Sequence, residues 1–237
     1  MTRSLVLSFL FVSASQLSAQ DGKLLERTTY TVADSSIAKW RARMPDIDGI
    51  LKGVQISRIT YLSDGLKVKG YMAVPTGKGP FPSVIFCRGG MMAYLALTRT
   101  TRFKAAVIRS GLTDAFKTAA ARPDMDRVFT DLMPGYTTDR DSVLLTRSPV
   151  RWAERLCKTT PILIEAGTGD NRVQADQALD MAQALYACKH PFRMLMLEGA
   201  DHYLSEFREE VDHATRLFLD TYVRDGKPWP SLVPHGK

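Results

Sequence analysis

Cysteine is scarce in this sequence, and its few cysteines are not spaced as metal ligands. The 237 residues contain Cys87, Cys157 and Cys188, and no two of them form a C-x-x-C pair. A zinc site is therefore not expected. Because three is an odd number, at most one disulfide can form within the chain and one thiol is left over. We expect neither a metal nor any other cofactor.

Blocks of one charge and long apolar runs are also missing. The formal net charge is +7, but Lys and Arg are interspersed with acidic residues, and no basic block carries interleaved aromatics. This pattern argues against nucleic-acid binding. Beyond the first 20 residues no run is apolar enough to cross a bilayer, so we expect no membrane anchor in the mature protein. The sequence also contains no internal repeat of solenoid length.

The N-terminus has the pattern of a secretory signal peptide. Residues 1–3 give a short basic start, residues 5–12 form an apolar core, and small residues lead up to Ala19 and Gln20. We expect cleavage near Ala19 or Gln20 and export to the periplasm or the exterior. The alternative is a membrane anchor, for which the apolar run is too short.

The remaining sequence is long enough for one large α/β domain. We divide the chain into a signal peptide (1–20), a lead-in with a short helix (21–53), the domain itself (54–225) and a proline-rich tail (226–237). The domain is predicted to open with an antiparallel hairpin, whose strands 54–62 and 66–74 flank the turn Ser63-Asp64-Gly65.

Buried-type strands and helices alternate after the hairpin. Strands are expected at residues 84–86, 103–108, 161–166 and 192–197. The longer helices are expected at residues 91–97, 175–188 and 206–224, with shorter helical pieces between residues 114 and 156. This alternation predicts a mostly parallel sheet with helices on both faces.

The stretch from residue 82 to residue 97 organises the rest of the domain. An apolar, partly β-branched run at 84–86 leads into the turn Cys87-Arg88-Gly89-Gly90 and then into a helix. Strand, tight glycine turn and helix is the geometry of a nucleophile elbow, in which backbone N–H groups help to hold the oxyanion. Cys87 would be the nucleophile, and Arg88 and Gly89 would supply those N–H groups. The leading glycine of the G-x-S-x-G pattern is missing, so the motif is incomplete.

Three candidate catalytic residues each follow a predicted strand. These are Cys87, Asp170 and His202, in the chain order nucleophile, acid, base that is typical of α/β-hydrolases. Because ligands of such sheets bind beyond the carboxyl ends of the strands, we expect these residues at one edge of the sheet. His202 would act as general base, oriented by Asp170, and a neighbouring imidazole would lower the pKa of the thiol.

Each of these residues also has a simpler interpretation. Asp170 could be an ordinary turn residue, His202 a polar loop residue, and Cys87 an inert buried thiol. Asp201 competes with Asp170 as the acid but is better suited to capping a helix. Ser110 also follows a strand, but it lacks the second glycine pair and the immediate helix of an elbow.

These motifs resemble the catalytic domain of the prolyl-oligopeptidase (S9) family of serine peptidases and related α/β-hydrolase esterases. The resemblance extends over about residues 54–224, and the segments that carry it are 59–71, 82–90, 169–173 and 198–202. It implies an α/β-hydrolase fold and hydrolysis of peptide or ester bonds by acyl transfer. It also implies that Asp170 and His202 are the acid and the base of the triad.

The sequence departs from that family at the elbow. In the family, a strand with a Gly-Gly turn carries the oxyanion loop, and a later G-x-S-x-G-G elbow carries the serine. Here residues 84–90 run directly into what resembles the helix after the elbow. Our hypothesis is that an in-frame deletion joined two similar Arg-Gly-Gly segments and removed the serine with some central strands.

Two functions follow from this departure. Cys87 stands where the serine would be, and some enzymes that resemble dienelactone hydrolases use a Cys-His-Asp set. The alternative is a catalytically inactive, truncated pseudoenzyme, which is either a binding remnant of the same fold or a poorly folding product. The propeller domain of the family's peptidases does not fit into residues 21–53, so both small peptides and small esters are expected as substrates.

Overall fold

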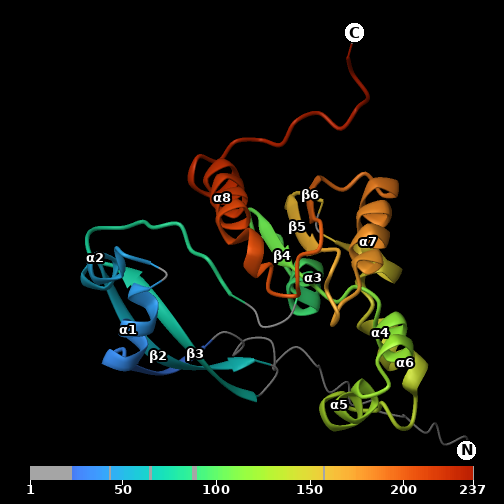
Figure 1. The fold of residues 1–237 in the computed structure, drawn as a ribbon, viewed down its shortest axis with the longest axis horizontal. Coiled ribbons are helices and arrows are strands. Elements are labelled where there is room, and N and C mark those ends of the chain that lie inside the picture. Colours follow the sequence, from blue (N-terminus) through green and yellow to red (C-terminus); the bar gives the residue numbers. More distant parts are fainter. Residues whose placement is uncertain (1–22, 43, 64–65, 87–89, 157, 237) are drawn as a thin grey trace, which may run out of the picture. The chain divides into compact units, whose positions relative to one another are not determined.

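A computed structural model describes residues 23–42, 44–63, 66–86, 90–156 and 158–236 (Figure 1). The chain forms two compact units, Met1–Phe81 and Pro82–Lys237. Among the described residues, no helix is both long and apolar enough to cross a membrane.

The first unit contains the expected hairpin in an antiparallel sheet of order β1-β2-β3. Strand β2 (Val54–Ser63) pairs with β3 (Leu66–Pro75) along its whole length, which confirms the hairpin. Strand β1 (Leu24–Thr29) lies in the lead-in, where we expected no strand, and it pairs with β2. All six residues of β1 are exposed, so the strand has no buried face to produce an alternating pattern, and the prediction missed it. The helices α1 (Asp34–Arg41) and α2 (Ile47–Lys52) lie between β1 and β2 in the chain.

The second unit is built on a parallel sheet of order β4-β5-β6, which confirms the predicted fold class. Strands β4 (Ala106–Arg109), β5 (Ile162–Gly167) and β6 (Phe192–Leu197) pair in parallel. Strand β5 is in the middle and all six of its residues are buried. Parallel strands need crossover connections, and those connections place helices over both faces of the sheet.

The two faces of β5 pack against different helices. Its alternate residues Ile162, Ile164 and Ala166 belong to a core with side chains of helix α3 (Gly90–Arg99), the 3₁₀ helix η3 (Pro149–Arg155) and helix α7 (Ala175–Ala187). Leu163, on the opposite face, packs with Phe218 and Tyr222. These two come from helix α8 (Arg208–Leu219) and from η5 (Asp220–Arg224), a π-helical turn that continues it. Figure 1 shows α8 and α7 on opposite sides of the sheet.

Three short helices follow β4 in the region that we expected to be irregular with helical pieces. They are α4 (Ala115–Ala121), α5 (Met125–Leu132) and α6 (Arg140–Thr146). They enclose a small core of their own around Phe129, Tyr136 and Leu144.

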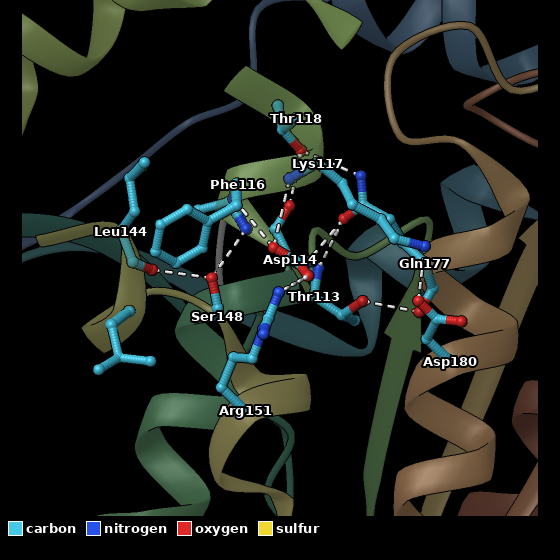
Figure 2. Close-up of polar contacts among 12 residues, drawn as sticks. Thr113, Asp114, Phe116, Lys117, Thr118, Leu144, Ser148, Arg151, Gln177 and Asp180 are labelled. Atoms are coloured by element: carbon cyan, nitrogen blue, oxygen red, sulfur yellow. Dashed lines mark hydrogen bonds and ion pairs between the residues drawn. The ribbon is translucent and has the colours of Figure 1, made fainter. Parts of the chain in front are cut away.

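A buried polar network connects α4 to α7 (Figure 2). The side-chain amide oxygen of Gln177 accepts hydrogen bonds from the backbone N–H groups of Thr113 (3.1 Å) and Asp114 (3.0 Å). Its amide nitrogen donates to Thr118 Oγ1 at 3.0 Å. One carboxylate oxygen of Asp114 caps α4, and the other accepts from Arg151 at 3.1 Å. Because these buried groups are hydrogen-bonded to one another, α4, η3 and α7 are held in one arrangement.

The expected strand at residues 84–86 does not form. These residues have no regular secondary structure, and Val84, Ile85 and Phe86 are 52%, 69% and 94% exposed. A β-type sequence forms a strand only where a neighbouring strand pairs with it. Among the described residues β4 pairs with β5 alone, so the segment has not joined the open edge of the sheet. The helix expected after it is present as α3.

Candidate active site

Asp170 lies in the turn that follows β5 and is almost completely buried. Its side chain is 2% exposed. One carboxylate oxygen, Oδ1, accepts hydrogen bonds from the backbone N–H groups of Arg172 (2.8 Å) and Val173 (3.0 Å). This turn geometry is typical of aspartate and fixes the carboxylate, leaving Oδ2 to face the loop after β6.

His202 lies in the loop after β6, and its imidazole contacts that free oxygen. The distance from His202 Nδ1 to Asp170 Oδ2 is 2.8 Å. Because an ionised carboxylate can only accept, Nδ1 carries the proton and the second ring nitrogen, Nε2, is left basic. Within the described part of the chain no other group forms a hydrogen bond with Nε2, and the side chain is 25% exposed. The arrangement is that of a general base held by a buried acid.

Close approach of the two loops makes this contact possible. The backbone N–H of Thr168 donates to Leu197 O (2.9 Å), and that of Gly169 donates to Ala200 O (3.1 Å). The Thr168 hydroxyl accepts from Gly199 N at 2.7 Å. A Cβ atom on Gly169 would collide with the Gly199 carbonyl. Only glycine therefore allows the loop after β5, with Asp170, to lie against the loop after β6, with His202.

An arginine and a tyrosine border the pair. The guanidinium of Arg172 lies 5.0 Å from the centroid of the Tyr203 ring, and the Tyr203 ring meets the His202 ring edge to face at 5.5 Å. Both flanking side chains are exposed. Arg172 lies within the segment 169–173 that carries the family resemblance, but the sequence predicts no role for it. Tyr203 was not predicted, because only its position next to His202 could have indicated it.

The three elbow candidates, Cys87, Arg88 and Gly89, lie outside the described residues. The next residue, Gly90, begins α3 and packs against the carboxyl end of β4. A Cβ atom on Gly90 would overlap the backbone of Gly111, two residues after β4 ends. Helix α3 therefore begins at the edge of the sheet where the loops with Asp170 and His202 lie.

Ser110 and Asp201 occupy different environments. Ser110 is 8% exposed, with a positive φ of 46°, and among the described residues its hydroxyl has no hydrogen-bond partner. It therefore forms no hydrogen bond with His202. The Asp201 carboxylate accepts from the backbone N–H groups of Tyr203 (2.9 Å) and Ser205 (3.1 Å). It therefore holds the loop after β6, but the N-cap of the following 3₁₀ helix η4 (Ser205–Phe207) is Leu204, not Asp201.

A buried carboxylate that the sequence analysis missed lies on the opposite face of β5. Glu165 is fully buried, and its two oxygens accept from Arg109 (2.9 Å) and from the Thr215 hydroxyl (2.7 Å). Its charge is paired and hydrogen-bonded, as buried charges generally are. In the part of the chain that the structure describes, no cluster of His, Cys, Asp and Glu side chains is arranged to hold a metal ion.

A parallel sheet with helices on both faces and an Asp–His pair at the strand ends defines an α/β-hydrolase domain. The family model that matches, Prolyl oligopeptidase family, covers residues 87–225. The chain therefore belongs to the prolyl oligopeptidase family, as the motifs indicated.

Individual relatives match smaller parts of the chain. The acylamino-acid-releasing enzyme of Mus musculus is 34% identical over 82 residues, which is 34% of this chain and 11% of that enzyme. The enzyme of the same name from Rattus norvegicus is 32% identical over 82 residues, with the same coverage. The structure of Pyrococcus horikoshii acylaminoacyl peptidase aligns with a TM-score of 0.52 at 19% identity, over 60% of this chain and 24% of that one. At this identity the structural likeness shows the fold alone.

Proposed function

We propose that this protein hydrolyses peptide or ester bonds by acyl transfer, with His202 as general base and Asp170 as the acid that orients it. The observation that carries the proposal is the 2.8 Å contact between His202 Nδ1 and a carboxylate that is 2% exposed. A buried carboxylate stabilises the imidazolium that forms when Nε2 takes up a proton. The partial exposure of the imidazole leaves that nitrogen open to a nucleophile.

The proposed nucleophile is Cys87. It stands three residues before Gly90, and the match to the family model begins at this cysteine. His202 would take the thiol proton while the sulfur attacks the carbonyl carbon, and backbone N–H groups of Arg88 and Gly89 would hold the oxyanion. The leaving amine or alcohol would receive that proton. Water activated by His202 would then hydrolyse the thioester and release the acid.

The proposed substrates are small acylated peptides and esters. The names of the rodent relatives state the release of acylamino acids, and esters are included because a thioester intermediate forms from either bond. Arg172, beside the pair, would place a positive charge near the substrate.

Paired activity-based labelling would test this proposal. The purified mature protein is treated with a fluorophosphonate probe and with a thiol-directed probe, and hydrolysis of p-nitrophenyl acetate and of an acetyl-amino-acid p-nitroanilide is measured. We expect thiol labelling that is lost in Cys87→Ala, and turnover that is lost in both Cys87→Ala and His202→Ala. His213→Ala, an exposed histidine of α8, is the matched control and should behave as the wild type.

A second candidate function is that of an inactive remnant that binds a partner. The observation that favours it is the exposure of residues 84–86, which lie outside the parallel sheet. In the described part of the second unit, this sheet has three strands. A cooperatively folded protein with no labelling and no turnover would support this function. Fluorophosphonate labelling that survives in Cys87→Ala would instead indicate a serine nucleophile. A genomic or transcript sequence that contains the intervening segment would refute the proposed deletion.

We also propose that the protein is exported. The proposal rests on the basic start, the apolar core and the small residues of positions 1–20. Expression with the native N-terminus, followed by cell fractionation and N-terminal sequencing, should give a periplasmic or secreted protein that begins near Gln20 or Asp21. An intact N-terminus on a cytoplasmic product would contradict export.

A further inference from the structure

Two buried hydroxyl groups in the second unit are not used by the proposed function. Tyr94, on α3, is 0% exposed, and Ser110, directly after β4, is 8% exposed. Among the described residues neither hydroxyl has a hydrogen-bond partner. A buried polar group without a partner costs free energy, and most buried hydroxyls in proteins have one. Two such groups in one region therefore indicate a polar ligand that they share.

Both hydroxyl-bearing residues line the same internal cavity. It lies between α3, the end of β4, the middle of β5 and the residues that follow Asp170. Thr113 and Gln174 also line it, together with Glu165, whose carboxylate points to the opposite face of β5. The cavity volume is about 10 Å³, close to the smallest volume that one buried water occupies. This size suits one water molecule.

The protonation state of the tyrosine is fixed by the same burial. Desolvation raises the pKa of the Tyr94 hydroxyl, because the phenolate would have no solvent. Tyr94 is therefore a neutral group that can donate one hydrogen bond. The Ser110 hydroxyl can donate and accept, and the residue is held in place by its backbone N–H, which donates to Glu165 O at 2.8 Å.

We propose that this cavity is a binding site for a single water molecule that bridges Tyr94 Oη and Ser110 Oγ. The water accepts a hydrogen bond from the tyrosine and exchanges one with the serine, so both buried hydroxyls are satisfied. The bridge joins α3 to the end of β4. Since Gly90 at the start of α3 packs on Gly111, the bridge also supports the point where the helix meets the edge of the sheet.

Conservative variants distinguish a hydrated cavity from a dry one. In a hydrated cavity, Tyr94→Phe and Ser110→Ala each remove a partner of the water, and each should lower the thermal midpoint of the second unit by about 2–4 °C. The double variant should lower it by less than the sum, because the two residues share one water. In a dry cavity, Tyr94→Phe removes an unsatisfied group, and the midpoint should stay the same or rise. Tyr186→Phe, an exposed tyrosine of α7, is the matched control and should change nothing.

A high-resolution crystal structure of the wild-type protein completes the test. We expect density for one water within about 3 Å of both hydroxyl oxygens, and its loss in the double variant. An empty cavity, or a Tyr94→Phe variant at least as stable as the wild type, would overturn the proposal. Neither readout depends on catalysis, so the outcome is independent of the proposed hydrolase activity.

Discussion

Replacement of Gln177 by methionine tests the network that joins the short helix α4 to α7. Gln177 is 1% exposed, and its side-chain amide hydrogen-bonds to Thr113, Asp114 and Thr118 (Figure 2). Methionine has a similar length and a similar helix propensity, but it makes no comparable hydrogen bond. The change therefore removes the polar contacts and leaves the helix itself intact.

The expected loss of stability follows from the groups that remain. The substitution leaves the buried N–H groups of Thr113 and Asp114 without an acceptor, and each such donor costs about 1–3 kcal/mol. The Thr118 hydroxyl keeps its bond to Asp114 O and contributes little to the loss. We therefore expect Gln177→Met to lower the free energy of unfolding by about 2–6 kcal/mol. A domain of this size has about 5–15 kcal/mol in total, so the effect is large.

Urea unfolding followed by circular dichroism would measure this loss. Gln183→Met is the matched control, because Gln183 lies on the same helix with its side chain exposed. The control should stay within about 0.5 kcal/mol of the wild type. If Gln177→Met also stayed within that range, the two backbone donors would have found other acceptors and the network would not be what holds α4 on α7.

The remaining predictions concern the acid–base pair and one surface ion pair. Asp170→Asn should lower turnover by about 10²–10⁴-fold in the assays above, because His202 loses its orienting carboxylate, and an unchanged rate would remove the pair from the mechanism. Gly169→Ala should separate the two loops, and the low-field NMR signal of the His202 Nδ1 proton should disappear, whereas a retained signal would show that the loops tolerate the methyl group. The Lys117 ammonium lies 2.5 Å and 2.6 Å from two aspartates of α7, and these hydrogen bonds raise its pKa from 10.5 to about 12. Its contribution to stability is therefore complete below pH 10.5 and is lost as the pH rises toward 12. The difference in free energy of unfolding between the wild type and Lys117→Met, measured by unfolding at a series of alkaline pH values, should therefore become smaller over that range.

The contact between Asp170 and His202 could be predicted from the sequence because it follows from one rule of parallel sheets. Asp170 and His202 each follow an apolar run that forms a buried strand, and the carboxyl ends of β5 and β6 meet at one edge. Gly167 and Gly169, at the end of β5 and in the turn after it, then allow the close approach. The residue types, their order and their positions after strands were all visible in the chain.

The packing face of α7 could not be predicted in the same way. The apolar character of Leu179 predicts a place on the inner face of this helix, but the residue is 53% exposed, while Gln177 is buried. A hydrophobicity pattern assigns amides to the surface. The buried position of Gln177 depends on unsatisfied backbone N–H groups at residues 113 and 114, which a sequence pattern does not reveal.

The proposed site has two halves, the Asp170–His202 pair and the segment that contains Cys87, and they come from separate parts of the chain. This separation determines how the function must be tested. The contacts that hold the Asp170–His202 pair join residues of the loops that follow β5 and β6. None of these contacts involves residues 82–90, where the nucleophile is proposed. The acid–base half can therefore be intact whether or not the protein is a working hydrolase. It follows that a well-formed His202–Asp170 hydrogen bond in solution would not separate an active cysteine hydrolase from an inactive remnant, whereas the effect of Cys87→Ala on turnover would.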